Sequence, residues 1–321
     1  MARSRSSTRW VAALLLALLA SGTAGRAAAQ AAGPPPAGWV VSGLQIAPKR
    51  RGPVFWRVSR GAAEVWVLAA PDSLTVGDWD TTQVKAILAQ TRVVYTPPRV
   101  SIGVFGALGV IFGGQYKEPG GRTLADVLTP AELARFTSVA KAARLKPGDW
   151  MRLRPAWAAA LLLPAALNAR HAAPPEARVG ALARQAHVPV RSVATFKAAA
   201  LLKELSAIPA RQAAPCLNAA VDDVAFQTAN LDEASRAWST GNLAALQRHY
   251  RADEGIGCVA RLGGLGQAVS LSVDDTVQAV QGALAQGGGA LFVLNMNAFL
   301  RPGGVAESLR RQGYEVDAPA E

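Results

Sequence analysis

The sequence has few of the side chains that build metal, redox or nucleophilic sites. Its 321 residues include three histidines and two cysteines, and the cysteines do not form a C-x-x-C motif. A G-x-S-x-G motif is absent, and the glycine-rich stretch 255–266 does not end in G-K-[ST]. These absences argue against a thiol redox centre, a serine hydrolase with a nucleophile elbow, and a phosphate-binding loop.

The histidines and the adjacent aspartates at 222–223 have local explanations. His249 and Asp253 are four residues apart, which on a helix would suit a metal ion, but a surface ion pair is the simpler interpretation. His171 lies in a predicted loop and His187 between a predicted helix and strand, so both are expected to cap helices or face solvent. The aspartates at 222–223 should diverge by about 100° on a helix, and we expect them to face solvent.

Basic residues exceed acidic ones without forming a nucleic-acid-binding pattern. Lys and Arg number 34 against 22 Asp and Glu, a formal net charge of +12. Outside the extreme N-terminus the densest basic cluster is only Lys49–Arg51, and no aromatic side chains are interleaved with it. Nucleic-acid binders concentrate their positive charge on one surface, so the sequence predicts no nucleic-acid partner.

The N-terminus has the pattern of a secretory signal over residues 1–29. Three arginines precede an apolar stretch, Trp10–Ala20, and small residues then offer a cut after residue 29 or 31. The apolar stretch is too short for a permanent membrane span. We therefore expect an exported protein, periplasmic or extracellular, that keeps no transmembrane helix after signal removal.

Two cysteines in an exported chain suggest a structural disulfide. Cys216 and Cys258 enclose a loop of about 40 residues, whose closure would stabilise the fold by a few kcal/mol. The alternative is a redox or metal-binding pair, and the missing C-x-x-C spacing makes the disulfide the preferred interpretation.

Hydrophobic patterning predicts an α/β protein. Residues 30–51 are rich in proline and basic residues and are expected to form a linker, followed by a single domain over 52–321. That domain begins with a predicted β-hairpin, alternates helices with strands, and ends in helix–strand–helix–strand. We expect a mainly mixed β-sheet flanked by helices, with a helical insertion near residues 195–260. The apolar stretch 100–114 is expected to be buried, with contact to a membrane surface as the alternative. The stretch 270–275 is expected to be a helix N-cap region.

Four segments, taken together, resemble the TraB/GumN family, which is related to the Tiki metalloproteases. They are the hairpin GPVFWRVSRGAAEVWVL, the helix start RPAWAAALLL, the helix–strand unit EARVGALARQAHVPVRSV, and the C-terminal ALAQGGGALFVLNMNAFLRPGGVAESLRRQGYEV. The resemblance covers residues 52–318. It implies an α/β sheet in which two Gly-x-x-His motifs and a glutamate, at strand ends, hold a divalent metal that activates water.

The positions that should carry this chemistry hold other residues. By the resemblance, the first Gly-x-x-His falls on residues 69–72, the glutamate and a further acid fall on two strand ends, and the second Gly-x-x-His falls on residues 296–299. The residues found at the motif positions are Ala69, Asp72, Thr96, Ala194, Met296 and Phe299. Of these residues only Asp72 has a side chain of a type that commonly binds a divalent metal. The sequence therefore predicts a catalytically inactive family member, a pseudoenzyme.

Two functions follow as hypotheses. The first is a non-catalytic exported protein without a cofactor, which binds a peptide, a protein partner or an envelope component. The second is a metal-dependent hydrolase or peptidase with an altered site, built on Asp72 with Asn295 or Asn297. Under the first hypothesis Asp72 occupies a former ligand position and stabilises the turn after Pro71.

Overall fold

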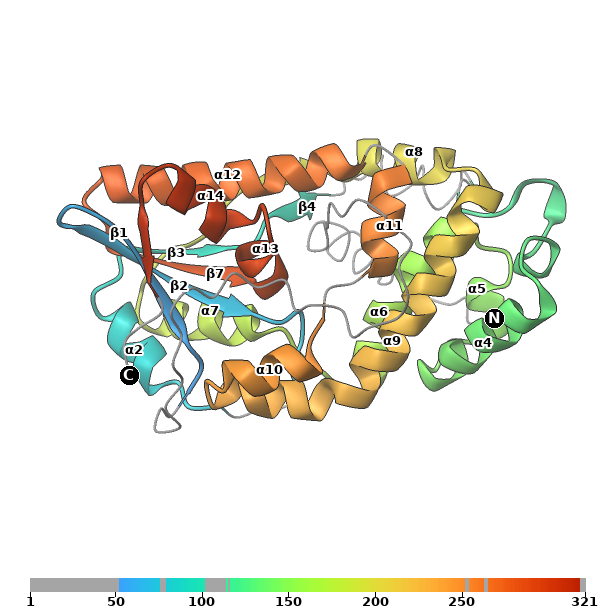
Figure 1. Cartoon of the computed structure of the whole chain (residues 1–321), viewed down its shortest axis with the longest axis horizontal. Helices are drawn as coiled ribbons and strands as arrows, with labels where there is room; N and C mark the ends of the chain where they lie inside the picture. Colours follow the sequence, from blue (N-terminus) through green and yellow to red (C-terminus); the bar gives the residue numbers. More distant parts are fainter. Residues whose placement is uncertain are drawn as a thin grey trace.

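The computed structural model describes residues 52–75, 79–101, 114, 116–251, 254–262 and 265–317. The predicted signal (1–29), the predicted linker (30–51), Asp253 and most of the stretch 100–114 lie outside the described residues. The described part contains a sheet covered by helices and, beside it, a lobe made mainly of helices (Figure 1).

The described residues form a six-stranded mixed sheet, which confirms the predicted fold class. The strand order is β5-β3-β7-β2-β1-β8. β1 pairs antiparallel with both β2 and β8, whereas β2, β7, β3 and β5 run parallel to one another. The strands are β1 (Phe55–Arg60), β2 (Ala63–Ala70), β3 (Val93–Thr96), β5 (Val190–Ser192), β7 (Ala290–Asn295) and β8 (Glu315–Asp317). β4 (Arg99–Ser101) and β6 (Thr195–Lys197) form a separate parallel pair.

Apolar residues of the central strands explain why the sheet is covered on both sides. In β7 every residue from Ala290 to Leu294 is buried, the pattern of a parallel strand with helices on both faces. In Figure 1, α12 and α14 lie above the sheet, and α2, α7 and α10 lie below it. The helices beside the sheet are α2 (Thr82–Leu88), α7 (Pro175–Gln185), α10 (Leu243–His249), α12 (Leu265–Ala285), α13 (Met296–Leu300) and α14 (Val305–Arg311).

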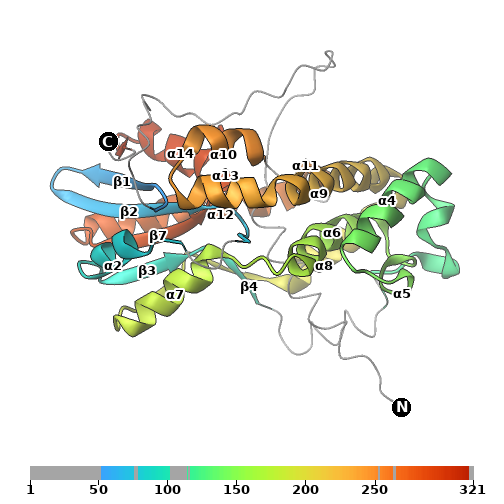
Figure 2. The same cartoon turned by 90° about the horizontal axis from the view of Figure 1, so that it is seen from below.

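The helical lobe has a hydrophobic cluster of its own. It contains most of the predicted insertion, although α10 and the end of α9 (Ala210–Ser239) pack on the sheet instead, and it also takes in helices from residues 130–169, which were not predicted to belong to it. The long helix α9 contributes its first part to this cluster and its last part to the core of the sheet. Figure 2 shows α9 passing from one lobe to the other. The other lobe helices are α4 (Pro130–Ala142), α5 (Pro147–Trp150), α6 (Pro155–Ala169), α8 (Ala198–Ala207) and α11 (Glu254–Leu262).

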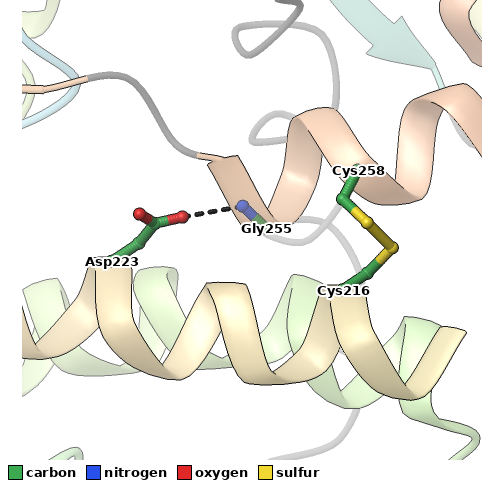
Figure 3. The surroundings of a disulfide bond; sticks show 4 residues. All are labelled: Cys216, Asp223, Gly255 and Cys258. Carbon is green, nitrogen blue, oxygen red and sulfur yellow. Dashed lines mark hydrogen bonds between the residues drawn. A yellow bond between two sulfur atoms is a disulfide. The ribbon is translucent and has the colours of Figure 1, made fainter. Parts of the chain in front are cut away.

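A disulfide joins α9 to α11, as predicted. Cys216 and Cys258 are bonded, with their Cα atoms 5.3 Å apart (Figure 3). Nearby, Oδ2 of Asp223 accepts a hydrogen bond of 2.7 Å from the backbone N–H of Gly255. A Cβ atom at Gly255 would lie 2.4 Å from the Cα of Ala220, so the two helices meet at backbone distance and only glycine fits.

Asp223 corrects one prediction. The aspartates at 222–223 were expected to face solvent, and Asp222 does, in an ion pair with Arg135. Asp223 instead is 2% exposed, because α11 packs over its side of α9. Its carboxylate bonds the first turn of α11 and lies 3.5 Å from the guanidinium of Arg251. The hydrogen bond from Gly255 and the charge of Arg251 offset the cost of burying this carboxylate. Neither contact can be predicted from the position of Asp223 in its own helix.

One further local prediction was wrong, one was confirmed, and the predicted pairing of His249 with Asp253 involves a residue outside the described ones. α10 ends at His249, and the His249 ring lies 2.8 Å from Oδ1 of Asn230. α12 begins at Leu265, which places residues 270–275 inside the helix rather than at its N-cap. His171 and His187 have positive φ directly after α6 and α7, the conformation of a helix C-terminus. No helix of the described part is long and apolar enough to cross a membrane.

Candidate functional site

The candidate site lies where the parallel strands end. Ala70 at the end of β2 pairs with Asn295 at the end of β7, and Thr96 at the end of β3 pairs with Ser192 at the end of β5. Because the carboxyl ends of parallel strands share one edge, the loops after them converge there. In Figure 1 the arrowheads of β2 and β7 point toward the side where the helical lobe lies.

Asp72 lies at this edge, one residue beyond Pro71, and is partly buried. Its Oδ1 accepts a hydrogen bond of 2.6 Å from Nδ2 of Asn295. The same Asn295 side chain is the N-cap of α13, because its Oδ1 accepts a bond of 2.9 Å from the backbone N–H of Ala298. Asp72 is therefore fixed to the junction between β7 and α13, 223 residues away in the sequence.

Glu176 lies beside Asp72 and is the site residue that the sequence did not single out. Leu74 and Ala173 form an antiparallel bridge with two backbone hydrogen bonds of 2.9 Å. This bridge brings the chain after β2 against the start of α7, where Glu176 occupies the first turn. An acid in the first turn of a helix usually complements the helix dipole, so the sequence offered no sign of a second role. We call Asp72 and Glu176 the carboxyl pair.

The environment of the carboxyl pair favours its protonated forms. Burial raises the pKa of Asp72 to about 6, although the hydrogen bond from Asn295 lowers it. Burial likewise raises the pKa of Glu176 to about 7, against the lowering effect of a hydrogen bond from its own backbone N–H, and the negative charge of Asp72 raises it further. Two carboxyl groups that resist ionisation at one sheet edge are typical of a functional site.

Three of the motif positions place no ligand at this edge. Ala69 is fully buried, and its carbonyl accepts a hydrogen bond of 2.8 Å from the indole N–H of Trp238. The hydroxyl of Thr96, also buried, donates to the carbonyl of Arg191 at 3.3 Å. Ala194 lies between β5 and β6 and offers only its backbone carbonyl, which accepts from the N–H of Arg99 at 2.9 Å.

The second motif is occupied by core side chains. Met296 and Phe299 on α13 are both 0% exposed. The Phe299 ring packs edge-on against Trp56 of β1, with ring centroids 5.5 Å apart. Where the resemblance places an imidazole, this chain therefore has an aromatic ring that fills the hydrophobic core.

The side chains of the site do not fit the histidine and carboxylate metal centre that the resemblance implies. The carboxyl pair supplies two anionic groups, but the oxygen of Asn295 already accepts from Ala298, and its amide N–H group faces Asp72. An amide N–H is a hydrogen-bond donor and does not bind a cation. Within the described ranges, no three side chains of His, Cys, Asp or Glu gather where they would hold a metal ion.

The six-stranded mixed sheet and its covering helices define an α/β protein, and sequence comparison defines its family. The TraB/PrgY/gumN family model matches residues 54–318, so the chain belongs to that family. No curated protein and no solved structure matches the chain significantly.

Proposed function

We propose that this protein is an exported, non-catalytic member of its family that binds a peptide, as a free ligand or as part of an envelope component, at the carboxyl edge of its sheet. The observation that carries the proposal is Phe299, whose ring is fully buried against Trp56 at the position of the second histidine. The predicted signal and the disulfide between Cys216 and Cys258 support export.

The carboxyl pair indicates which part of the peptide binds there. Burial removes water from both carboxylates and so raises both pKa values, and the negative charge of Asp72 raises the pKa of Glu176 further. A lysine ammonium, an arginine guanidinium or an N-terminal amine would offset both effects and pair with the two carboxylates. A cationic peptide is therefore the ligand that this site favours.

Glu176 also favours the second hypothesis, a metal-dependent hydrolase, because it adds a carboxylate beside Asp72. A divalent ion at that point would have to compete with the hydrogen bond from Asn295 for Asp72. It would also lack the imidazole ligands expected at a hydrolytic zinc centre. The geometry thus supports binding of an organic cation better than metal-assisted hydrolysis.

Selection from a random peptide library by the purified mature protein tests this function. We expect selected peptides to be enriched in lysine and arginine. Binding at about pH 8 should weaken about tenfold or more in Asp72→Asn, which keeps the acceptor for Asn295 and loses the charge. The matched control is Asp222→Asn, because Asp222 is an exposed acid on α9 that pairs with Arg135.

Two results would contradict the proposal. Equal peptide binding by the wild type and Asp72→Asn would show that the carboxyl pair does not bind the peptide. Cleavage of the selected peptides by the wild type, detected by mass spectrometry and lost in Asp72→Asn, would show that the protein is an enzyme.

A further inference from the structure

Two buried hydrogen-bond donors, one on α13 and one at the residue that ends it, have no acceptor among the described residues. Asn297 is 5% exposed, and its Nδ2 is buried without a hydrogen-bond partner. The Nε of Arg301, at the end of the same helix, is likewise buried and unpaired. Native proteins rarely leave buried donors unsatisfied, so each such group calls for a partner. We call these two residues the donor pair.

The donor pair shares one face of α13. The backbone N–H of Arg301 donates to the carbonyl of Asn297 at 3.0 Å, the hydrogen bond of residues one helical turn apart. Side chains at that spacing are neighbours on the helix surface. Asn297 and Arg301 therefore lie on the same side of α13, a helix that packs against α14.

The charge of Arg301 has no counter-ion among the described residues. Burial lowers the pKa of its guanidinium, and no acidic side chain is found to oppose that effect. The arginines of the neighbouring helix α14 differ: Arg311 lies 3.5 Å from Glu307, and Arg310 donates to the carbonyl of Val316 at 2.9 Å. The guanidinium groups of Arg311 and Arg310 therefore have a carboxylate and a carbonyl partner, whereas the Nε of Arg301 has no partner among the described residues.

We propose that Asn297 and Arg301 form a binding site for an oxyanion, that is, a carboxylate or a phosphate group. The Nε edge of a guanidinium presents two parallel N–H donors, which match two oxygens of such a group. The amide of Asn297 adds a third donor from the same helix face. An oxyanion would satisfy both buried donors and balance the charge of Arg301.

This site is separate from the carboxyl pair and does not rest on the proposed function. Asp72 accepts a hydrogen bond from Asn295, which precedes the first turn of α13. The carboxylates of Asp72 and Glu176 would repel an anion, so the oxyanion would not bind at the carboxyl pair. The opposite charge preference of the two sites keeps their tests independent. Peptides that need Asp72 report on one site, and inorganic anions that need Arg301 report on the other.

The experiment measures the melting temperature of the mature protein in increasing inorganic phosphate or acetate, with ionic strength held constant by sodium chloride. We expect a saturable rise, because a ligand that binds only the folded state stabilises it. The rise should be lost in Arg301→Gln and in Asn297→Leu, and kept in the matched control Arg311→Gln. Without added anion, Asn297→Leu should melt no lower than the wild type, because leucine removes a buried unpaired donor.

Each outcome decides the proposal. A stronger response to phosphate than to acetate supports a phosphate ligand, and the reverse supports a carboxylate. A rise that is equally large in Arg301→Gln, or no saturable rise in the wild type, would overturn the proposal and leave water molecules as the partners of both donors. If Asn297→Leu does not fold, Arg301→Gln and the ¹⁵N shift of the wild-type Arg301 Nε during the same titration still decide it.

Discussion

Replacing Phe299 by alanine is expected to lower the free energy of unfolding by about 3–5 kcal/mol. The ring is 0% exposed and packs edge-on against Trp56, so its removal takes apolar surface out of contact and leaves a cavity between α13 and β1. Urea unfolding followed by circular dichroism measures this change. If the Phe299 side chain had no role in packing, the same truncation would leave the free energy of unfolding nearly unchanged.

Leu271→Ala is the control for this prediction. Leu271 lies on α12 and is 46% exposed, so its truncation should cost less than about 0.5 kcal/mol. A loss of less than about 1 kcal/mol in Phe299→Ala would show that this ring is not a core residue. The interpretation of the second motif as part of the hydrophobic core would then be wrong.

Asp72→Asn should make the folded protein less sensitive to pH. The pKa of Asp72 is about 6 in the folded protein against an ordinary 3.8, so the folded state binds more protons than the unfolded state between these values. The free energy of unfolding therefore falls as the pH rises through this window, by up to about 3 kcal/mol from this group. Glu176, with a pKa of about 7, extends the fall to near neutral pH.

Above about pH 7 we expect Asp72→Asn to be more stable than the wild type by about 1–3 kcal/mol, and near pH 4 to match it. Urea unfolding between these values gives the comparison. Asp222→Asn, which removes a charge from the exposed face of α9, should follow the wild-type profile. Identical pH profiles for the wild type and Asp72→Asn would show that this carboxyl group is not desolvated.

Local sequence patterns were enough to predict most of the sheet. The apolar run at 290–294 is long, continuous and followed by a polar residue, and it forms the buried central strand β7. The hairpin of β1 and β2 turns at Gly61, which has a positive φ of 62°. Thr129 and Glu132 form the capping box that begins α4, and Pro130 follows at its first turn, a local pattern that marks a helix start.

The site could be predicted only in part, because its second acid depends on a distant contact. The position of Asp72 after β2 follows from the order of the strands. Glu176 reaches it through the bridge between Leu74 and Ala173, which are about 100 residues apart, and no local pattern specifies that pairing. The burial of Asp223 has the same origin, because it depends on α11 folding back onto α9.

The donor pair was hidden for a related reason. Asn297 resembles any polar residue near a strand end, and the sequence offered it only as an alternative metal ligand. Its unpaired Nδ2 becomes visible only when α13 is seen against its neighbours, with Asn295 already used as the N-cap. Arg301 looks like a surface residue until its buried Nε is noted.

The metal content of the purified mature protein, measured after dialysis against zinc or manganese and removal of free ions, tests the central claim most directly. We expect no stoichiometric metal in the wild type and no difference in Asp72→Ala, because Asp72 accepts a hydrogen bond from Asn295 and a buried phenylalanine stands where the resemblance places an imidazole. About one tightly held ion per chain that is lost in Asp72→Ala would contradict it, because that stoichiometry defines a metal centre.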